Sequence, residues 1–92
     1  MKKYLEGTRR INTEEYRNIN LEYYLIESTY IETGLSKTAY GIEILKTTGE
    51  LIETDIIQKI TDSKLKAMEI INKLIANTVT PIGMVYAIDE LI

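Results

Sequence analysis

Three glutamates occupy positions from which a sheet would bring their carboxylates together. Counting through two predicted turns sets Glu27 opposite Glu43 and Glu43 opposite Glu53, so all three would form one row across one face. Two carboxylates can act as acid and base, as in glycoside hydrolysis, and carboxylate oxygens also bind Mg²⁺ or Ca²⁺. Because like charges opposite one another destabilise a sheet, such a row predicts a nearby cation, basic partner or lysine.

The rest of the sequence offers little else for catalysis. The chain has no cysteine and no histidine, which removes thiolate chemistry, disulfides and the commonest general base and metal ligand. No loop has EF-hand spacing, and a bare sheet face provides no cleft. A solvated face with a different register explains the glutamates equally well. We therefore predict no catalytic residue, no metal and no cofactor, and keep a carboxylate-based enzyme as an alternative.

Length and charge indicate a small globular protein. The 92 residues, 45% hydrophobic and 27% charged, fit one domain covering residues 1–92. No apolar run is long enough for a signal peptide or a membrane span, which predicts a cytoplasmic protein without membrane contact. The formal net charge of −3 disfavours non-specific binding to nucleic acid, which depends on clustered Lys and Arg.

Residues 1–20 include several basic side chains. Among them are Lys2, Lys3, Arg9 and Arg10. Polar residues dominate from Thr8 to Asn20, so the segment is either an edge strand or a flexible arm. As an arm, its basic residues would support a second alternative, a small nucleic-acid-associated protein.

Strands are predicted over residues 21–31, 37–46 and 50–60, where Ile, Leu, Tyr and Thr are frequent. The first turn lies at residues 33–36. For the second turn, a three-residue loop ending at Gly49 pairs Ile44 with Ile52 and gives the glycine the left-handed conformation of a bulge turn. The strands would thus form an antiparallel meander.

Two helices follow the predicted strands. Thr61 or Asp62 caps the first helix, and Asn77 is its expected left-handed C-cap. Thr80 followed by Pro81 opens the second helix. The expected apolar positions are Leu65, Met68, Ile70, Ile71, Leu74 and Ile75 in the first helix, and Ile82, Val85, Ile88 and Ile92 in the second.

The strand pattern assigns the apolar residues to two faces of the sheet. Ile26, Ile42, Ile44, Ile52 and Ile56 are expected to face the helices. The opposite face would carry Ile57 and a predicted interaction face made of Leu21, Tyr23, Leu25, Glu27, Glu43, Leu45, Leu51 and Glu53. A sheet face this apolar is seldom exposed, so either residues 1–20, a protein partner or a second copy should cover it. We therefore expect a non-enzymatic interaction or regulatory module, with a homodimer as one form of it.

Two segments carry a family resemblance. They are Tyr40–Ile44 (YGIEI) and Asn77–Pro81 (NTVTP), the latter followed by a short terminal helix that contains Asp89. Over about residues 21–92 the chain resembles a family of small uncharacterised proteins from Firmicutes, domain of unknown function 6514. The resemblance implies a fold and no activity. Together with the pattern, it favours an α+β fold with three or four antiparallel strands followed by two helices packed on one face.

Overall fold

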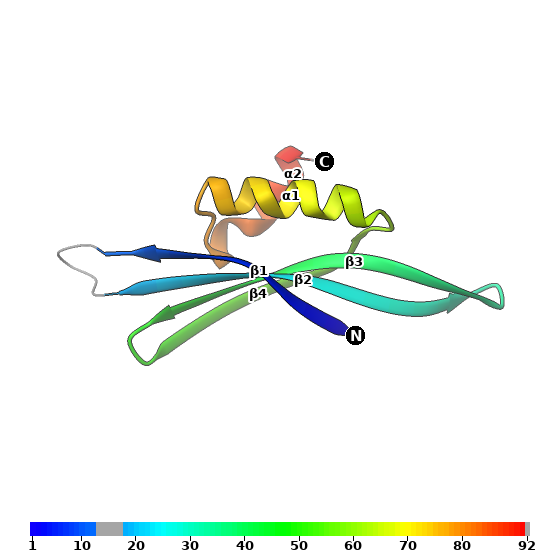
Figure 1. The fold of residues 1–92 in the computed structure, drawn as a ribbon, viewed down its shortest axis with the longest axis horizontal. Coiled ribbons are helices and arrows are strands. Elements are labelled where there is room, and N and C mark those ends of the chain that lie inside the picture. Colours follow the sequence, from blue (N-terminus) through cyan, green and yellow to red (C-terminus); the bar gives the residue numbers. More distant parts are fainter. Residues whose placement is uncertain (13–17, 92) are drawn as a thin grey trace.

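The computed structural model describes residues 1–12 and 18–91. Its strands are β1 (Lys2–Ile11), β2 (Ile19–Glu32), β3 (Leu35–Thr48) and β4 (Leu51–Thr61), followed by α1 (Lys64–Ala76), the 3-10 turn η1 (Pro81–Gly83) and α2 (Met84–Leu91) (Figure 1). The strands form one antiparallel sheet in the order β1-β2-β3-β4. The predicted α+β meander is confirmed, and the N-terminal segment supplies an edge strand where an arm was the alternative.

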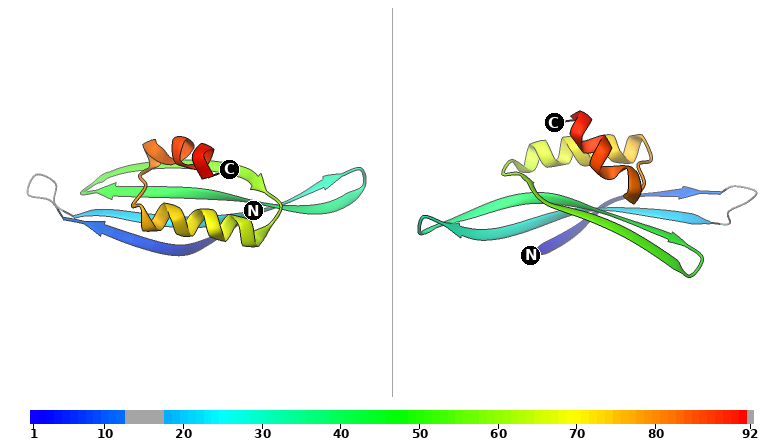
Figure 2. Two further views of the ribbon diagram at one scale, coloured as in Figure 1. Left: turned by 90° about the horizontal axis from the view of Figure 1, so that it is seen from above. Right: turned by 180° about the vertical axis from the view of Figure 1, so that it is seen from behind.

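Both helices lie on the same face of the sheet. Figure 2 shows that they cover its middle, while the β2–β3 and β3–β4 hairpins extend beyond them. The molecule is therefore long and thin, measuring 54 × 26 × 18 Å. We call the side of the sheet under the helices the helix face and the opposite side the outer face.

The hydrophobic core lies between the helix face and the two helices. Its sheet residues alternate along β2 and β3, because successive side chains in a strand point to opposite faces. Buried core residues are Leu21, Tyr23, Leu25, Ile42 and Ile44 from the sheet, and Ala67, Ile70, Ile71, Leu74, Met84 and Ile88 from the helices. The predicted inward placement of Ile42 and Ile44 is confirmed.

The β2–β3 and β3–β4 hairpins both have two-residue turns, so the predicted strand registers are wrong. Glu32 pairs with Leu35, and Thr48 pairs with Leu51, so Ile44 lies opposite Asp55 instead of Ile52. Each register differs from the predicted one by three residues. Because an odd shift exchanges the two faces of a strand, the inward and outward sets of β2 and β4 are the reverse of those predicted.

The helix ends differ from the predicted ones by one or two residues. Ser63 is the N-cap of α1, and its hydroxyl accepts a hydrogen bond of 3.1 Å from the Lys66 amide. Thr61 instead accepts from the Ser63 amide. Asn77 is the C-cap of α1, as predicted, but it is not left-handed; the left-handed residue is Thr78, with φ of 51°. Thr80 does precede η1, as predicted.

The buried stripes of the helices also differ in part. In α1, Leu65 is exposed, and the small residue Ala67 contacts the core in its place. In the second helical segment Ile88 is buried as predicted, but Ile82 and Val85 are exposed and Met84 is buried. Ile92 lies outside the described residues. The 3-10 turn at η1 displaces the helical phase, which is why periodicity counted from Thr80 selects the wrong face.

Three contacts fix the end of α1 and the following loop against the sheet. A Cβ on Gly7 would lie 2.7 Å from Ile75 Cδ1, so the glycine allows close packing of β1 on α1. Arg9 Nε donates to the Ile75 carbonyl at 3.0 Å, near the negative end of the helix dipole. The Tyr23 hydroxyl donates to the Val79 carbonyl at 2.9 Å. Burial raises the pKa of Tyr23 to about 12, although the charge of Arg9 acts in the opposite direction.

Candidate functional site

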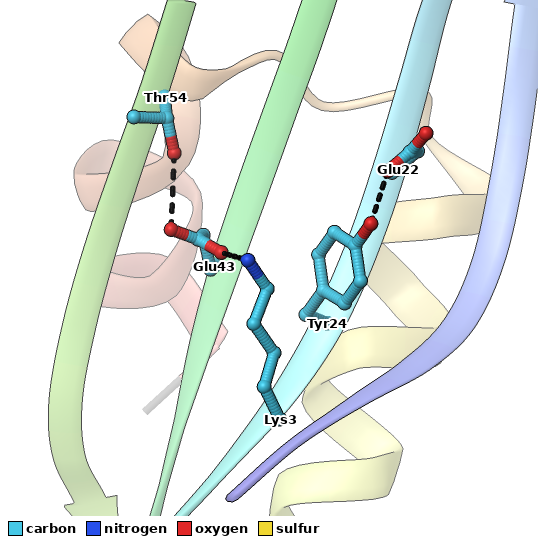
Figure 3. Close-up of polar contacts among 5 residues, drawn as sticks. All are labelled: Lys3, Glu22, Tyr24, Glu43 and Thr54. Atoms are coloured by element: carbon cyan, nitrogen blue, oxygen red, sulfur yellow. Dashed lines mark hydrogen bonds and ion pairs between the residues drawn. The ribbon is translucent and has the colours of Figure 1, made fainter. Parts of the chain in front are cut away.

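The outer face consists of four rows of side chains that run across the strands. The register sets Lys3 beside Ile26 and Gly41; Leu5 beside Tyr24, Glu43 and Ile56; Thr8 beside Glu22, Leu45 and Thr54; and Arg10 beside Asn20, Thr47 and Ile52. Figure 3 shows five of these side chains, with the helices behind the sheet.

A lysine and a glutamate form the polar centre of the outer face. Lys3 Nζ on β1 forms an ion pair with Glu43 Oε1 on β3, across the intervening strand β2. The other carboxylate oxygen, Glu43 Oε2, accepts a hydrogen bond of 3.2 Å from the Thr54 hydroxyl on β4. The Glu43 side chain is only 14% exposed. Its Oε1 atom is buried and accepts no hydrogen bond, so the ion pair with Lys3 is the contact that offsets its charge.

A tyrosine links the same centre to the next row. The Lys3 ammonium lies 4.2 Å from the centre of the Tyr24 ring, a cation–π contact. The Tyr24 hydroxyl donates a hydrogen bond to Glu22 Oε2. This bond raises the pKa of Tyr24 to about 12, with further contributions from burial and from the charges of Glu22 and Glu43. At neutral pH the phenol therefore stays a hydrogen-bond donor.

A shallow polar hollow of about 550 Å³ lies at one end of the face. Its lining residues are Thr8, Arg9, Arg10, Asn20, Leu21, Glu22 and Thr47. Arg10 Nε donates to Asn20 Oδ1 at 3.1 Å, which holds the guanidinium against the sheet. The hollow has hydrogen-bond donors and acceptors but few apolar walls, unlike the pockets that enclose most small ligands.

Apolar side chains flank the polar centre on both edge strands. Leu5 on β1 is 56% exposed, and Ile52 and Ile56 on β4 are 62% and 38% exposed. Leu45 on β3 is half-buried between them, and Ile26 on β2 is fully buried. The outer face therefore combines paired charges with exposed aliphatic side chains.

The structure places only two of the eight predicted interaction-face residues on the outer face. Those two are Glu43 and Leu45. Leu21, Tyr23 and Leu25 were predicted there as well, but they are at most 1% exposed and form the core beneath α1. They cannot contact a partner without unfolding. The cause is the three-residue error in the β2–β3 register.

The other three predicted interaction-face residues are on the helix side of the sheet, outside the area that the helices cover. They are Glu27, Leu51 and Glu53. Leu51 pairs with Thr48 near the β3–β4 turn and is exposed. Ile57, predicted on the outer side, packs against the core. Conversely, Ile52 and Ile56 were expected inside and lie outside.

The predicted row of three carboxylates does not form. Glu27 pairs with Tyr40 and accepts a hydrogen bond of 3.2 Å from the Tyr4 hydroxyl. Glu53 pairs with Lys46, and their charged atoms are 3.6 Å apart. Of the three glutamates, only Glu43 lies on the outer face. Its carboxylate forms an ion pair with Lys3. The carboxylates are therefore neither a catalytic pair nor a common cation site. Within residues 1–12 and 18–91, no three acidic, histidine or cysteine side chains converge to hold a metal ion.

The basic N-terminal residues do not form one patch. Lys3 and Arg10 lie on the outer face, whereas Arg9 lies on the helix face and contacts α1. The nucleic-acid alternative relied on a basic arm, and Lys2–Ile11 is an edge strand.

Sequence reasoning missed several residues of the site, among them Lys3, Leu5, Tyr24, Ile52 and Ile56. One signal was present in β2, where polar Asn20 and Glu22 alternate with apolar residues at 21, 23 and 25. That alternation places the odd positions inside and Tyr24 outside. For Lys3 there was no comparable signal, because its partner lies two strands away.

Comparisons with known proteins place the chain in a family but supply no activity. No match was found among curated proteins or among solved structures. None of the helices that the structure describes is long and apolar enough to cross a membrane. One family model matches residues 2–92, which includes β1, a segment that the sequence resemblance did not cover. The chain therefore belongs to the family of unknown function DUF6514, as the resemblance indicated.

Proposed function

We propose that this protein is a non-enzymatic interaction module, with a structural or regulatory role, that binds another protein chain through the outer face. The observation that carries the proposal is the exposure of Leu5, Ile52 and Ile56 on one sheet face whose opposite side is covered by helices. Burial of such aliphatic side chains by a partner would be favourable by about 25 cal/mol per Å² of apolar area.

The charges of the outer face support a protein partner over a free ion. Glu43 already has Lys3 and Thr54 as partners, and Glu22 has Tyr24. A site built for a free ion would offer charges that lack partners. Charges that are paired within the chain lower the cost of burying this face under an apolar surface.

The position of β1 supports the proposal that the outer face is covered by something other than the described residues of the same chain. The N-terminal residues were one candidate to cover the outer face. They lie at the edge of the sheet instead, where they add Leu5 to the exposed apolar surface. Among the described residues, no segment packs over Ile52 and Ile56.

A site-specific photocrosslinker tests the proposal in cells. The crosslinking residue would replace Ile56 on the outer face or, as a matched control, exposed Leu65 on α1. We expect a defined covalent adduct from position 56 and a much weaker one from position 65. Equal adducts from both positions, or none from position 56, would show that the outer face has no specific protein partner.

A further inference from the structure

The inference made here rests on the proposed function and names the partner. We propose that the partner is a second copy of this chain, stacked outer face to outer face. Its two-fold axis runs parallel to the strands, so that β1 of each copy lies over β4 of the other. The assembly is a two-sheet sandwich with a helical layer on each outside.

The surface of the chain is larger than a monomer of its size should expose. Its accessible area is 6191 Å², whereas folded monomers of the same mass expose roughly 5,500 Å². The excess, roughly 700 Å², is close to the 800 Å² or so that each partner contributes to a standard interface. The radius of gyration, 14.3 Å, also exceeds the value of about 12 Å for a compact domain of this length.

The charge of the outer face permits contact with an identical copy. The chain as a whole has a net charge of −3. In the four-stranded part of the outer face, however, Lys3 and Arg10 balance Glu22 and Glu43. Two copies that meet through this face oppose no net charge at the contact, because the net charge of −3 is carried by residues elsewhere on the chain.

The register determines which side chains would meet. With the axis parallel to the strands, rows stay aligned and the order of strands is reversed between the copies. Leu5 then lies over Ile56 of the second copy, and Arg10 lies over Ile52. The contact is isologous, so each pair occurs twice. Leu5 and Ile56 thus bury each other, Ile52 is covered by the Arg10 side chain, and no like charges are opposed.

The other two-fold arrangement is less favourable. An axis perpendicular to the strands would place β1 over β1 with the rows reversed. Lys3 would then lie over Arg10 of the second copy, and Leu5 would lie over Thr8. Two opposed basic residues and an unmatched leucine make this arrangement the weaker of the two.

Sedimentation velocity of the full chain and its variants tests the assembly. We expect wild type and the control variant Leu65→Glu to be dimers. Ile56→Glu should raise the dissociation constant of the dimer at least about tenfold, because the new carboxylate is buried against Leu5 of the second copy. At position 52 the effect on the dimer should depend on the sign of the introduced charge. Ile52→Lys would face Arg10 of the second copy and weaken the dimer, whereas the carboxylate of Ile52→Glu can form an ion pair with that arginine. Equal effects of the two charges would overturn the proposed axis.

A cysteine pair reports the arrangement directly, because the chain has no native cysteine. Leu5 and Ile56 lie on opposite edge strands, three strand spacings or about 14 Å apart within one copy. We expect a short bis-maleimide to give covalent dimers when the L5C and I56C variants are mixed, and few with either variant alone. Efficient dimers from L5C alone would indicate the perpendicular axis.

The results separate failure of this inference from failure of the proposed function. A monomeric wild type, together with a photocrosslinked adduct of another mass from position 56, would overturn self-association and leave the outer face as an interaction site. A dimer that survives Ile56→Glu but is lost in Ile82→Glu, a variant on the helical side, would overturn both.

Discussion

Lys3 on the edge strand β1 reaches over the Tyr24 ring and forms an ion pair with Glu43 on β3, so an acid in the middle of the sheet is neutralised from its edge. This contact joins the N-terminal strand to the part of the sheet that carries one of the two family-resemblance motifs. It also removes the charge that would otherwise oppose burial of the outer face. The ion pair and the proposed contact surface are therefore linked.

Lys3→Met should destabilise the monomer by about 1–2 kcal/mol, because it leaves the mostly buried Glu43 carboxylate without a charged partner. The matched control is Lys46→Met, which breaks the more exposed pair with Glu53 and should cost at most about 0.5 kcal/mol. Urea denaturation at low protein concentration measures both. Adding Glu43→Gln to Lys3→Met should recover part of the loss, and equal losses for the two lysine variants would contradict the assigned role of Lys3.

Two strand glycines should differ sharply in their tolerance of alanine. A Cβ on Gly41 would collide with the Ile57 carbonyl oxygen and lie 2.8 Å from the Gln58 Cα, both backbone atoms that cannot move freely. Gly41→Ala should therefore cost about 3 kcal/mol. On Gly7 the colliding atom is the end of the Ile75 side chain, which can rotate, so Gly7→Ala should cost about 1 kcal/mol or less. Thermal unfolding would measure both, and the reverse order would contradict the packing of β3 on β4.

Two tyrosines should make the free energy of unfolding depend on pH in the alkaline range. Burial raises the pKa of Tyr23 to about 12, and the hydrogen bond to Glu22 raises that of Tyr24 to about 12, from an ordinary value of 10.0. Because the folded pKa is the higher one, the stabilisation is complete below pH 10 and is lost as the pH rises toward 12. The free energy of unfolding should thus fall more steeply between these limits in wild type than in Tyr24→Phe. Parallel pH profiles would show that Tyr24 ionises normally.

The fold was largely predictable because its strands and helices have clear local signals. β2 and β3 are rich in β-formers, Ser and Thr precede the helices, and Pro81 opens the second one. The order of elements then allows few topologies, of which a meander with helices on one face is the simplest. These signals act over a few residues and do not depend on how strands align.

The candidate site was not predictable in the same way, because it depends on register. Gly49 has φ of 60° and suits the observed two-residue turn as well as the predicted three-residue one. In β4, isoleucines occupy both parities, at positions 52 and 56 and at position 57, so alternation cannot decide which side is buried. Packing against α1 and β3 decides it, and that information is tertiary.

An isotope-filtered NOE experiment on a mixture of differently labelled wild-type copies shows whether the outer faces of two copies contact each other. We expect intermolecular NOEs between the methyl groups of Leu5 and Ile56, which are too far apart within one copy to give them. Intermolecular NOEs confined to the helical side, at Ile82 or Tyr86, would contradict this contact.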